Sequence, residues 1–168
     1  MTHALAAATI ASPGFDYAAL APILIIFVAA LVSVILEAVL PQPSRRGAQV
    51  ILVFVALIVS LVTVFLLADT KITTADGALA IDGPGLFLQG ATLLISILAA
   101  FVMFERRVDP AGDAFTPRAS ALPGSADEKE FGEQGWQQTE IWPLFLFCVG
   151  GMLVFVTSND LLTMFVAL

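Results

Sequence analysis

The sequence predicts an all-α protein: a polytopic transmembrane helix bundle with four complete helices, the start of a fifth, and the N-terminus outside. Hydrophobic residues make up 59% of the chain and charged residues 12%, whereas a soluble domain is closer to half apolar and a quarter charged. Three of four long apolar runs reach the roughly 20 residues that cross a ~30 Å hydrocarbon core. These runs are Leu20–Leu40, Val50–Ala68, Gly85–Phe104 and Ile141–Val156. The rest of the chain has too little polar surface to cover four such helices in water.

The sequence predicts a short outer tail over residues 1–16. The first three transmembrane helices are expected over residues 17–104. The first helix is expected from Tyr17 to Leu40. Pro41-Gln42-Pro43 should end it, because proline has no N–H and disfavours helical backbone in the residue before it. Ser44–Gly47 is interpreted as a tight basic loop, and Ala48–Ala68 as the second helix.

A polar connection over Asp69–Pro84 separates the second helix from the third, which is expected over Gly85–Phe104. Within this connection, Asp76-Gly77 stands between apolar or β-branched stretches, a pattern that predicts a small β-hairpin.

The segment 105–139 is expected to be a mobile cytoplasmic loop. Its core, Val108–Thr139, is hydrophilic and rich in proline and glycine, so it buries too little apolar surface to offset the entropy of ordering. Residues 140–168 then predict a fourth helix, Ile141–Ser158, and the start of a fifth with Asn159 or Asp160 as its N-cap. No helix stop signal precedes the end at Leu168, and we expect the chain to end inside that fifth helix.

The basic residues predict the orientation, because cytoplasmic loops carry an excess of Lys and Arg. With four crossings, only Lys71 falls on the side opposite to the other basic residues, which are Arg45, Arg46, Arg106, Arg107, Arg118 and Lys129. The N-terminus is therefore expected outside. Tyr17 and Trp142 stand at helix starts, where aromatic side chains often mark the membrane interface.

Glu37 is the candidate residue for a proton path, because it is the ionisable residue placed inside an apolar run. Intramembrane carboxylates are costly and often lie on ion or proton paths. A plainer interpretation is favoured by about two to one: Glu37 precedes Pro41 by four residues, roughly 6 Å along a helix, which allows its carboxylate to reach the inner interface.

Other polar or small residues inside the helices are interpreted as packing residues in preference to functional ones. Gln89, Thr92 and Ser96 form one stripe on the third helix, which would bond to neighbouring helices or touch a hydrated channel. The pair Gly150-Gly151 is expected to let helices approach closely. Cys148 is interpreted as a small apolar filler.

The composition argues against several other functions. A single cysteine and a single histidine predict no disulfide framework and no metal site, and the net charge of −7 argues against nucleic-acid binding. We find no phosphate loop, dinucleotide fingerprint or nucleophile constellation. We therefore predict no catalytic, cofactor-binding or metal-binding residues in this chain, and the lipid bilayer as its surroundings.

The C-terminal stretch carries a resemblance to a known family. Phe147–Leu168 reads FCVGGMLVFVTSNDLLTMFVAL and closely resembles the segment joining helices 4 and 5 in subunit N of bacterial NADH-quinone oxidoreductase (respiratory complex I), typically LFSTLGMMLLASANDLLTLFVGLE. Ile81–Phe87, IDGPGLF, resembles the V-D-G-F-A-x-F that opens helix 3 there. The order of elements also matches this antiporter-like family of membrane subunits.

The resemblance implies the N-terminal portion of a proton-translocating membrane-arm subunit in the bacterial inner membrane, with other membrane-arm subunits as partners. NADH, FMN, iron–sulfur clusters and quinone would then belong to other subunits. The family's next residue after Leu168 is a glutamate on helix 5, which pairs with a lysine on helix 7; neither lies in these 168 residues. We therefore expect no ion transport by this chain alone.

Two alternatives remain open from the sequence. One is a related antiporter-like subunit, either a complex I paralogue or a subunit of a multisubunit sodium/proton antiporter. The other is a non-transporting membrane scaffold protein. The coding sequence beyond Leu168 and the neighbouring genes would separate these alternatives.

Overall fold

The computed structural model describes residues 14–104 and 140–168. The mobile loop expected over residues 105–139 and most of the expected outer tail lie outside these described residues.

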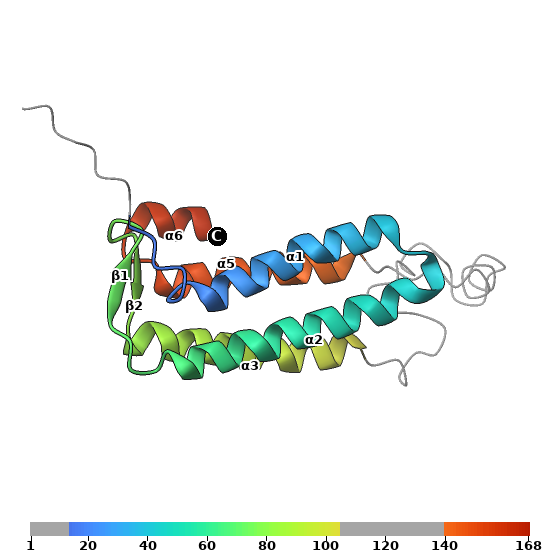
Figure 1. Cartoon of the computed structure of the whole chain (residues 1–168), viewed down its shortest axis with the longest axis horizontal. Helices are drawn as coiled ribbons and strands as arrows, with labels where there is room; N and C mark the ends of the chain where they lie inside the picture. The colour runs from blue at the N-terminus through green and yellow to red at the C-terminus, as the bar shows by residue number, and fades with distance from the viewer. Residues whose placement is uncertain (1–13, 105–139) are drawn as a thin grey trace, which may run out of the picture.

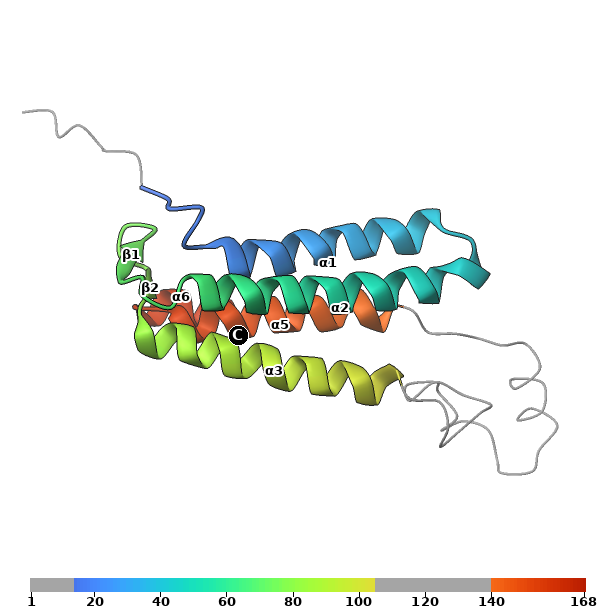
Figure 2. The same cartoon turned by 60° about the horizontal axis from the view of Figure 1, so that its bottom comes forward.

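Four helices form an antiparallel bundle (Figures 1 and 2), and a fifth, short helix follows the last of them. The helix α1 packs against α2 and α5, and α3 packs against the same two helices from the other side. The five helices of the described residues are α1 (Ala21–Val39), α2 (Gln42–Leu66), α3 (Gly83–Phe104), α5 (Ile141–Thr157) and α6 (Leu161–Ala167). The prediction of an all-α bundle is confirmed.

The bundle has two distinct ends (Figure 1). One end carries a two-stranded β-hairpin, β1 (Ile72–Thr74) and β2 (Leu79–Ile81), together with the start of α6. We call it the hairpin end. The other end carries the α1–α2 connection and the C-terminus of α3. We call it the arginine end, after Arg45 and Arg46.

Apolar side chains fill the interior and also cover the outside of the bundle. Leu57, Leu93, Leu146 and Leu153 are fully buried where the helices meet. Large side chains such as Ile35, Ile51 and Ile95 point outward and are 60%, 66% and 67% exposed. A water-soluble protein rarely exposes so much contiguous apolar surface. Three helices of the described residues are long and apolar enough to span a membrane, and α5 is a shorter apolar helix, so the apolar exterior is typical of a protein that spans a membrane.

The start of α2 shows that the predicted loop before the second helix is wrong. The proposed basic loop Ser44–Gly47 belongs to the opening turns of α2, which begins at Gln42. Proline near the first helical position supplies a helical φ and gives up only an N–H that would have no partner there, so Pro43 starts the helix instead of delaying it. Leu40 and Pro41 both take extended backbone, with ψ of 143° and 147°, and these two residues form the turn that reverses the chain.

The hairpin predicted around Asp76-Gly77 is confirmed. Strands β1 and β2 pair antiparallel, with Ile72 opposite Ile81. Gly77 has a φ of +88°, which glycine adopts without steric cost. The hairpin also contacts two distant segments: Asp16 N donates to Thr74 Oγ1 at 3.0 Å, and Asn159 N donates to Ala78 O at 2.8 Å.

Two side chains lie where the sequence did not place them. Trp142, expected at the lipid interface, is 1% exposed and packs inside the bundle. It lies in the first turn of α5, on the face that packs against the neighbouring helices. Cys148, expected to fill an internal gap, is exposed on the outer surface of α5. Both differences depend on the rotation of α5 about its own axis, whereas Tyr17 is exposed as an interface residue should be.

Candidate functional site

A polar cluster joins α1 and α2 one turn inside the arginine end. Glu37 Oε1 pairs with Arg45 Nη1 at 3.0 Å, and Glu37 Oε2 accepts from Gln49 Nε2 at 3.1 Å. The same Gln49 nitrogen donates to Ser33 O at 2.8 Å, and the Ser33 hydroxyl donates to Gln49 Oε1. Ser33 and Gln49 are fully buried. The cluster therefore runs from the helix end into the apolar interior.

Arg45 also terminates α1. Its Nε and Nη2 donate to Leu40 O at 3.2 and 2.9 Å, which provides donors for a carbonyl left without an intrahelical partner at a helix C-terminus. A cation is also favoured there by the helix dipole. One guanidinium thus compensates both the Glu37 carboxylate and the end of α1.

Arg46 makes the corresponding contact with α3. Its Nη2 donates to Phe104 O at 3.3 Å, and its guanidinium carbon lies 5.5 Å from the centroid of the Phe104 ring. Adjacent arginines at the start of α2 therefore hold the C-terminal ends of both neighbouring helices, α1 and α3.

The geometry of Glu37 fits a charged carboxylate at a helix end. Both oxygens have partners, one of them a cation, and the Glu37 side chain is 16% exposed. An ion pair and a second hydrogen bond offset the cost of holding a carboxylate near apolar surroundings. The cluster orients Glu37 toward α2, and Ser33, one turn away, is its other member on α1.

Sequence reasoning selected Glu37 but missed its partners. Ser33 and Glu37 are four residues apart on α1, and Arg45 and Gln49 are four apart on α2. Residues four apart share a helix face, so the spacing within each pair already indicated a polar face on each helix. Two such pairs flanking a proline turn are the pattern that could have found the cluster.

The polar stripe on α3 is only partly used between helices. Gln89 Nε2 lies 3.5 Å from Leu153 O of α5, the long limit of a hydrogen bond. The Ser96 hydroxyl donates to Thr92 O within its own helix at 2.8 Å. Of the three stripe residues, only Gln89 reaches a neighbouring helix through a bond found in the described residues.

The glycine pair on α5 packs against two different helices, and the prediction of close approach is confirmed. A Cβ at Gly150 would lie 3.0 Å from the Phe27 ring of α1. A Cβ at Gly151 would lie 2.8 Å from the backbone oxygen of Ala167 in α6. Adjacent helix positions point in different directions, so Gly150 allows close approach of α1 and Gly151 allows close approach of α6.

Asp160 is the N-cap of α6, which decides between the two residues proposed for this role. Its Oδ1 accepts from Thr163 N at 2.7 Å, and Oδ2 accepts from the Thr163 hydroxyl at 2.7 Å. Asn159 instead binds the hairpin, with Nδ2 donating to Gly77 O at 2.8 Å. The hydrogen bonds from Thr163, the backbone amide first, hold the pKa of Asp160 below its usual 3.8.

We expect the cap at Asp160 to weaken only in strong acid. A lowered carboxyl pKa means that its contribution is fully present above the ordinary value of 3.8 and is lost as the pH falls through the lowered value. Asp160→Ala should reduce the hydrogen-exchange protection factor of the Thr163 amide at neutral pH, while Asp160→Asn, which still caps, should largely retain it. Equal protection in both variants would contradict the capping role.

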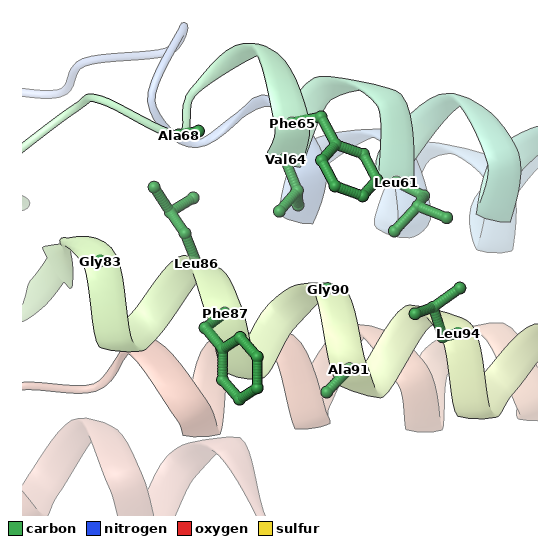
Figure 3. Close-up of a pocket in the computed structure, with 10 residues that line it drawn as sticks. All are labelled: Leu61, Val64, Phe65, Ala68, Gly83, Leu86, Phe87, Gly90, Ala91 and Leu94. Atoms are coloured by element: carbon green, nitrogen blue, oxygen red, sulfur yellow. The ribbon is translucent and has the colours of Figure 1, made fainter.

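An apolar groove of about 450 Å³ lies between α2 and α3 near the hairpin end (Figure 3). Phe65 lines it from α2, and Phe87, Gly90 and Ala91 line it from α3. All ten lining residues are apolar or glycine, so the groove offers no acid, base or nucleophile. In the described part of the chain, no group of three His, Cys, Asp or Glu side chains is arranged to hold a metal ion.

These features define a class: a multi-pass α-helical membrane protein whose helix ends at one face are held by arginines and a buried polar cluster. Comparison with known proteins finds relatives that match nearly the whole of this chain. The chain is 46% identical to NADH-quinone oxidoreductase subunit N of Rhodococcus opacus (strain B4), over 96% of this chain and 33% of that protein. It is 45% identical to subunit N of Salinispora arenicola (strain CNS-205), over 93% of this chain and 30% of that protein.

Similar proteins named subunit N occur in other genera. The chain is 44% identical to that of Mycobacterium tuberculosis (strain ATCC 25618 / H37Rv), over 94% of this chain and 33% of that protein. The matches cover the N-terminal portion of these proteins, and the chain spans about a third of their length. No family model matches the chain. The resemblance to the subunit N family is thus confirmed: the chain is homologous to the N-terminal part of its members.

Proposed function

We propose that this chain is the N-terminal part of a membrane-arm subunit of proton-translocating NADH:quinone oxidoreductase. The observation that carries the proposal is identity of 41–46% with proteins named subunit N, over nearly the whole chain. The same matches argue against the multisubunit antiporter and scaffold alternatives. The coupling of electron transfer to proton transport would be a property of the assembled complex, with NADH, FMN, iron–sulfur clusters and quinone bound by other subunits.

In this proposal the described helices form a supporting block. The polar cluster and the two arginines hold α1, α2 and α3 at the arginine end, and the hairpin holds the α5–α6 turn at the other. The exposed apolar faces would then contact lipid and the neighbouring membrane-arm subunits. The bundle sets the position of α6, on which the family places its proton-handling carboxylate after Leu168.

A chimera tests the function. The matching N-terminal third of a mycobacterial subunit N is replaced by this chain, and NADH-driven proton uptake is measured in inverted membrane vesicles. We expect pumping within about twofold of the parent, because the identity extends along nearly the whole segment. Full assembly with NADH:quinone activity but without proton uptake, or failure to assemble despite expression, would contradict the proposal.

Glu37→Gln in this chimera separates a proton path from a structural role. Because both carboxylate oxygens are bonded at the helix end, we expect proton uptake per NADH to remain within about twofold of the unmodified chimera. The amide keeps the size and can still accept at one atom from Arg45. A loss of tenfold or more in proton uptake, with normal assembly, would instead establish Glu37 on the proton path.

The proposed orientation places the hairpin end outside and the arginine end in the cytoplasm, as the distribution of basic residues predicts. Single cysteines at Thr73 in β1 and Ser44 in α2, both exposed, test it in a Cys148→Ala background. A membrane-impermeant maleimide should label the Thr73→Cys variant in intact cells, and the Ser44→Cys variant only after permeabilisation. The reverse pattern would refute the orientation.

A further inference from the structure

The apolar groove between α2 and α3 opens on the outer surface of the bundle. Val64 of α2 and Leu86 of α3 point toward each other across it (Figure 3) and are only 5% and 4% exposed. Phe65 and Phe87, which also line it, are 69% and 74% exposed. The lining therefore passes from buried to exposed side chains, so a molecule outside the bundle can enter the groove from the side.

The groove extends along one half of α3. Its lining residues on this helix run from Gly83, the first helical residue, to Leu94, a length of roughly 16 Å at 1.5 Å per residue. Half of a ~30 Å hydrocarbon core is about 15 Å. The groove therefore has the length of one bilayer leaflet, whereas a transmembrane helix crosses both leaflets.

The cross-section of the groove fits an extended chain. A volume of about 450 Å³ spread over roughly 16 Å leaves a mean cross-section of about 28 Å², whereas a helix about 10 Å across needs about 80 Å². An extended peptide would bring unpaired N–H and C=O groups into this wholly apolar lining, which is strongly unfavourable in hydrocarbon. An unbranched hydrocarbon chain has no such groups, so it is the occupant that the groove can take.

Gly90 provides part of the space on the α3 side. A Cβ there would meet only Val64 Cγ1, at 3.7 Å, whereas a Cβ at Gly150 or Gly151 would meet its neighbours at 3.0 or 2.8 Å. Close packing thus explains the glycines of α5 but not Gly90. Glycine weakens the interior of a helix, so its place here is explained by the open groove that it leaves.

The groove ends where charged residues begin. Ala68, the lining residue that follows α2, precedes Asp69 and Lys71, which are both exposed. Along this direction the surface changes from apolar to charged, as a phospholipid does from its acyl chain to its phosphate. Lysine binds phosphate as a point charge, and basic residues beside a bilayer attract anionic lipid groups. Among the described residues, Lys71 is the basic side chain of the hairpin end.

We propose that the groove holds one acyl chain of a bilayer phospholipid from the leaflet at the hairpin end, with the lipid phosphate beside Lys71. The length, the narrow cross-section and the apolar lining fit a single hydrocarbon chain, and the charged end fits its headgroup. This assignment requires only that the bundle spans a membrane, so it stands or falls separately from proton transport.

Photocrosslinking of the full chain in phosphatidylcholine nanodiscs tests the proposal. A small fraction of the lipid carries a diazirine in the middle of one acyl chain, and peptide mass spectrometry counts the modified residues. We expect Leu94, which lines the groove, to be modified about threefold or more as often as Ile95, although Leu94 is 51% exposed and Ile95 is 67% exposed. Labelling in proportion to exposure would mean that lipid only passes by, and protection of Leu94 would mean that protein fills the groove; either result would overturn the proposal.

Filling the groove provides a second measurement. Gly90→Leu should abolish the excess modification of Leu94 and leave Ile95 unchanged, because the new side chain occupies the space of the acyl chain. Leu98→Phe enlarges an exposed side chain outside the groove and should retain the excess. Ala91→Leu fills the same groove from the next position and replaces Gly90→Leu if that variant does not fold. A folded variant of either kind that keeps the excess would overturn the proposal.

Native mass spectrometry tests the position of the headgroup. The full chain released from detergent should retain one phospholipid. Lys71→Gln should lower the retained fraction about threefold or more, whereas Lys71→Arg keeps the cation and should leave it unchanged. Equal retention in both variants would overturn the placement of the phosphate beside Lys71.

Discussion

Gly151→Ala is expected to push α6 away from α5 and to destabilise the bundle by about 1–3 kcal/mol, the usual cost of overpacking. The added Cβ would lie 2.8 Å from the Ala167 backbone oxygen. A backbone atom cannot rotate away as a side chain can, so the α6 helix as a whole has to move. Helix propensity alone would predict the opposite result, a gain of about 1 kcal/mol.

Gly90→Ala is the matched control for this prediction. Gly90 also lies inside an apolar helix, but its new Cβ would meet the nearest atom, Val64 Cγ1, at an ordinary 3.7 Å. We expect this variant to be as stable as the parent or more stable. Gly150→Ala should lie between the two, because the Phe27 ring it meets at 3.0 Å is a side chain that can shift.

Spin labels can measure the displacement directly. Leu144 on α5 and Phe165 on α6 are 67% and 77% exposed, so labels at these positions should not disturb the packing. In a Cys148→Ala background, electron–electron double resonance should show a longer or broader label distance for Gly151→Ala and an unchanged distance for Gly90→Ala. Unchanged distances in both would mean that α6 is not held against Gly151.

Arg45→Ala is expected to cost about 2–3 kcal/mol of unfolding free energy. Removing one partner of a buried ion pair costs about 3–5 kcal/mol, and Arg45 and Glu37 retain 25% and 16% side-chain exposure, which reduces the value. The substitution also removes both donors to Leu40 O. Chemical unfolding in mixed micelles provides the measurement.

The neighbouring residue provides the control for Arg45. Arg46→Ala removes the same charge from the same helix, but its bond to Phe104 O is longer, at 3.3 Å, and exposed. We expect a loss of about 1 kcal/mol or less, as for exposed pairs. A double-mutant cycle between Glu37→Gln and Arg45→Gln should give a coupling of at least about 1 kcal/mol. Equal losses for both arginines, with no coupling, would disprove the special role of Arg45.

The polar cluster shows how far sequence reasoning extends into the site. The position of Glu37 near Pro41 favoured a location at the helix end over a central proton path, and the role of Glu37 stays a prediction that Glu37→Gln tests. The identity of the partners was not predicted, because the opening turns of α2 were interpreted as a loop. A loop would have separated Arg45 from the helix face that carries Gln49.

The sequence by itself determined the features that depend on local chemistry. Apolar runs define the helices, prolines separate α1 from α2, Asp76-Gly77 makes the hairpin, and Asn159-Asp160 marks the start of α6. Each of these follows from a few consecutive residues, whose backbone preferences and transfer energies act without distant neighbours. The family resemblance likewise depends on a continuous stretch, Phe147–Leu168.

Only the tertiary structure decided which residues meet across helices. The contact of Gly151 with α6, the burial of Trp142, the outward position of Cys148 and the contact of Gln89 with α5 all depend on how each helix is rotated about its axis. In helices that are apolar on nearly every face, a hydrophobic stripe cannot specify that rotation. Close packing and a few buried polar bonds determine it instead, and these arise only when the helices are together.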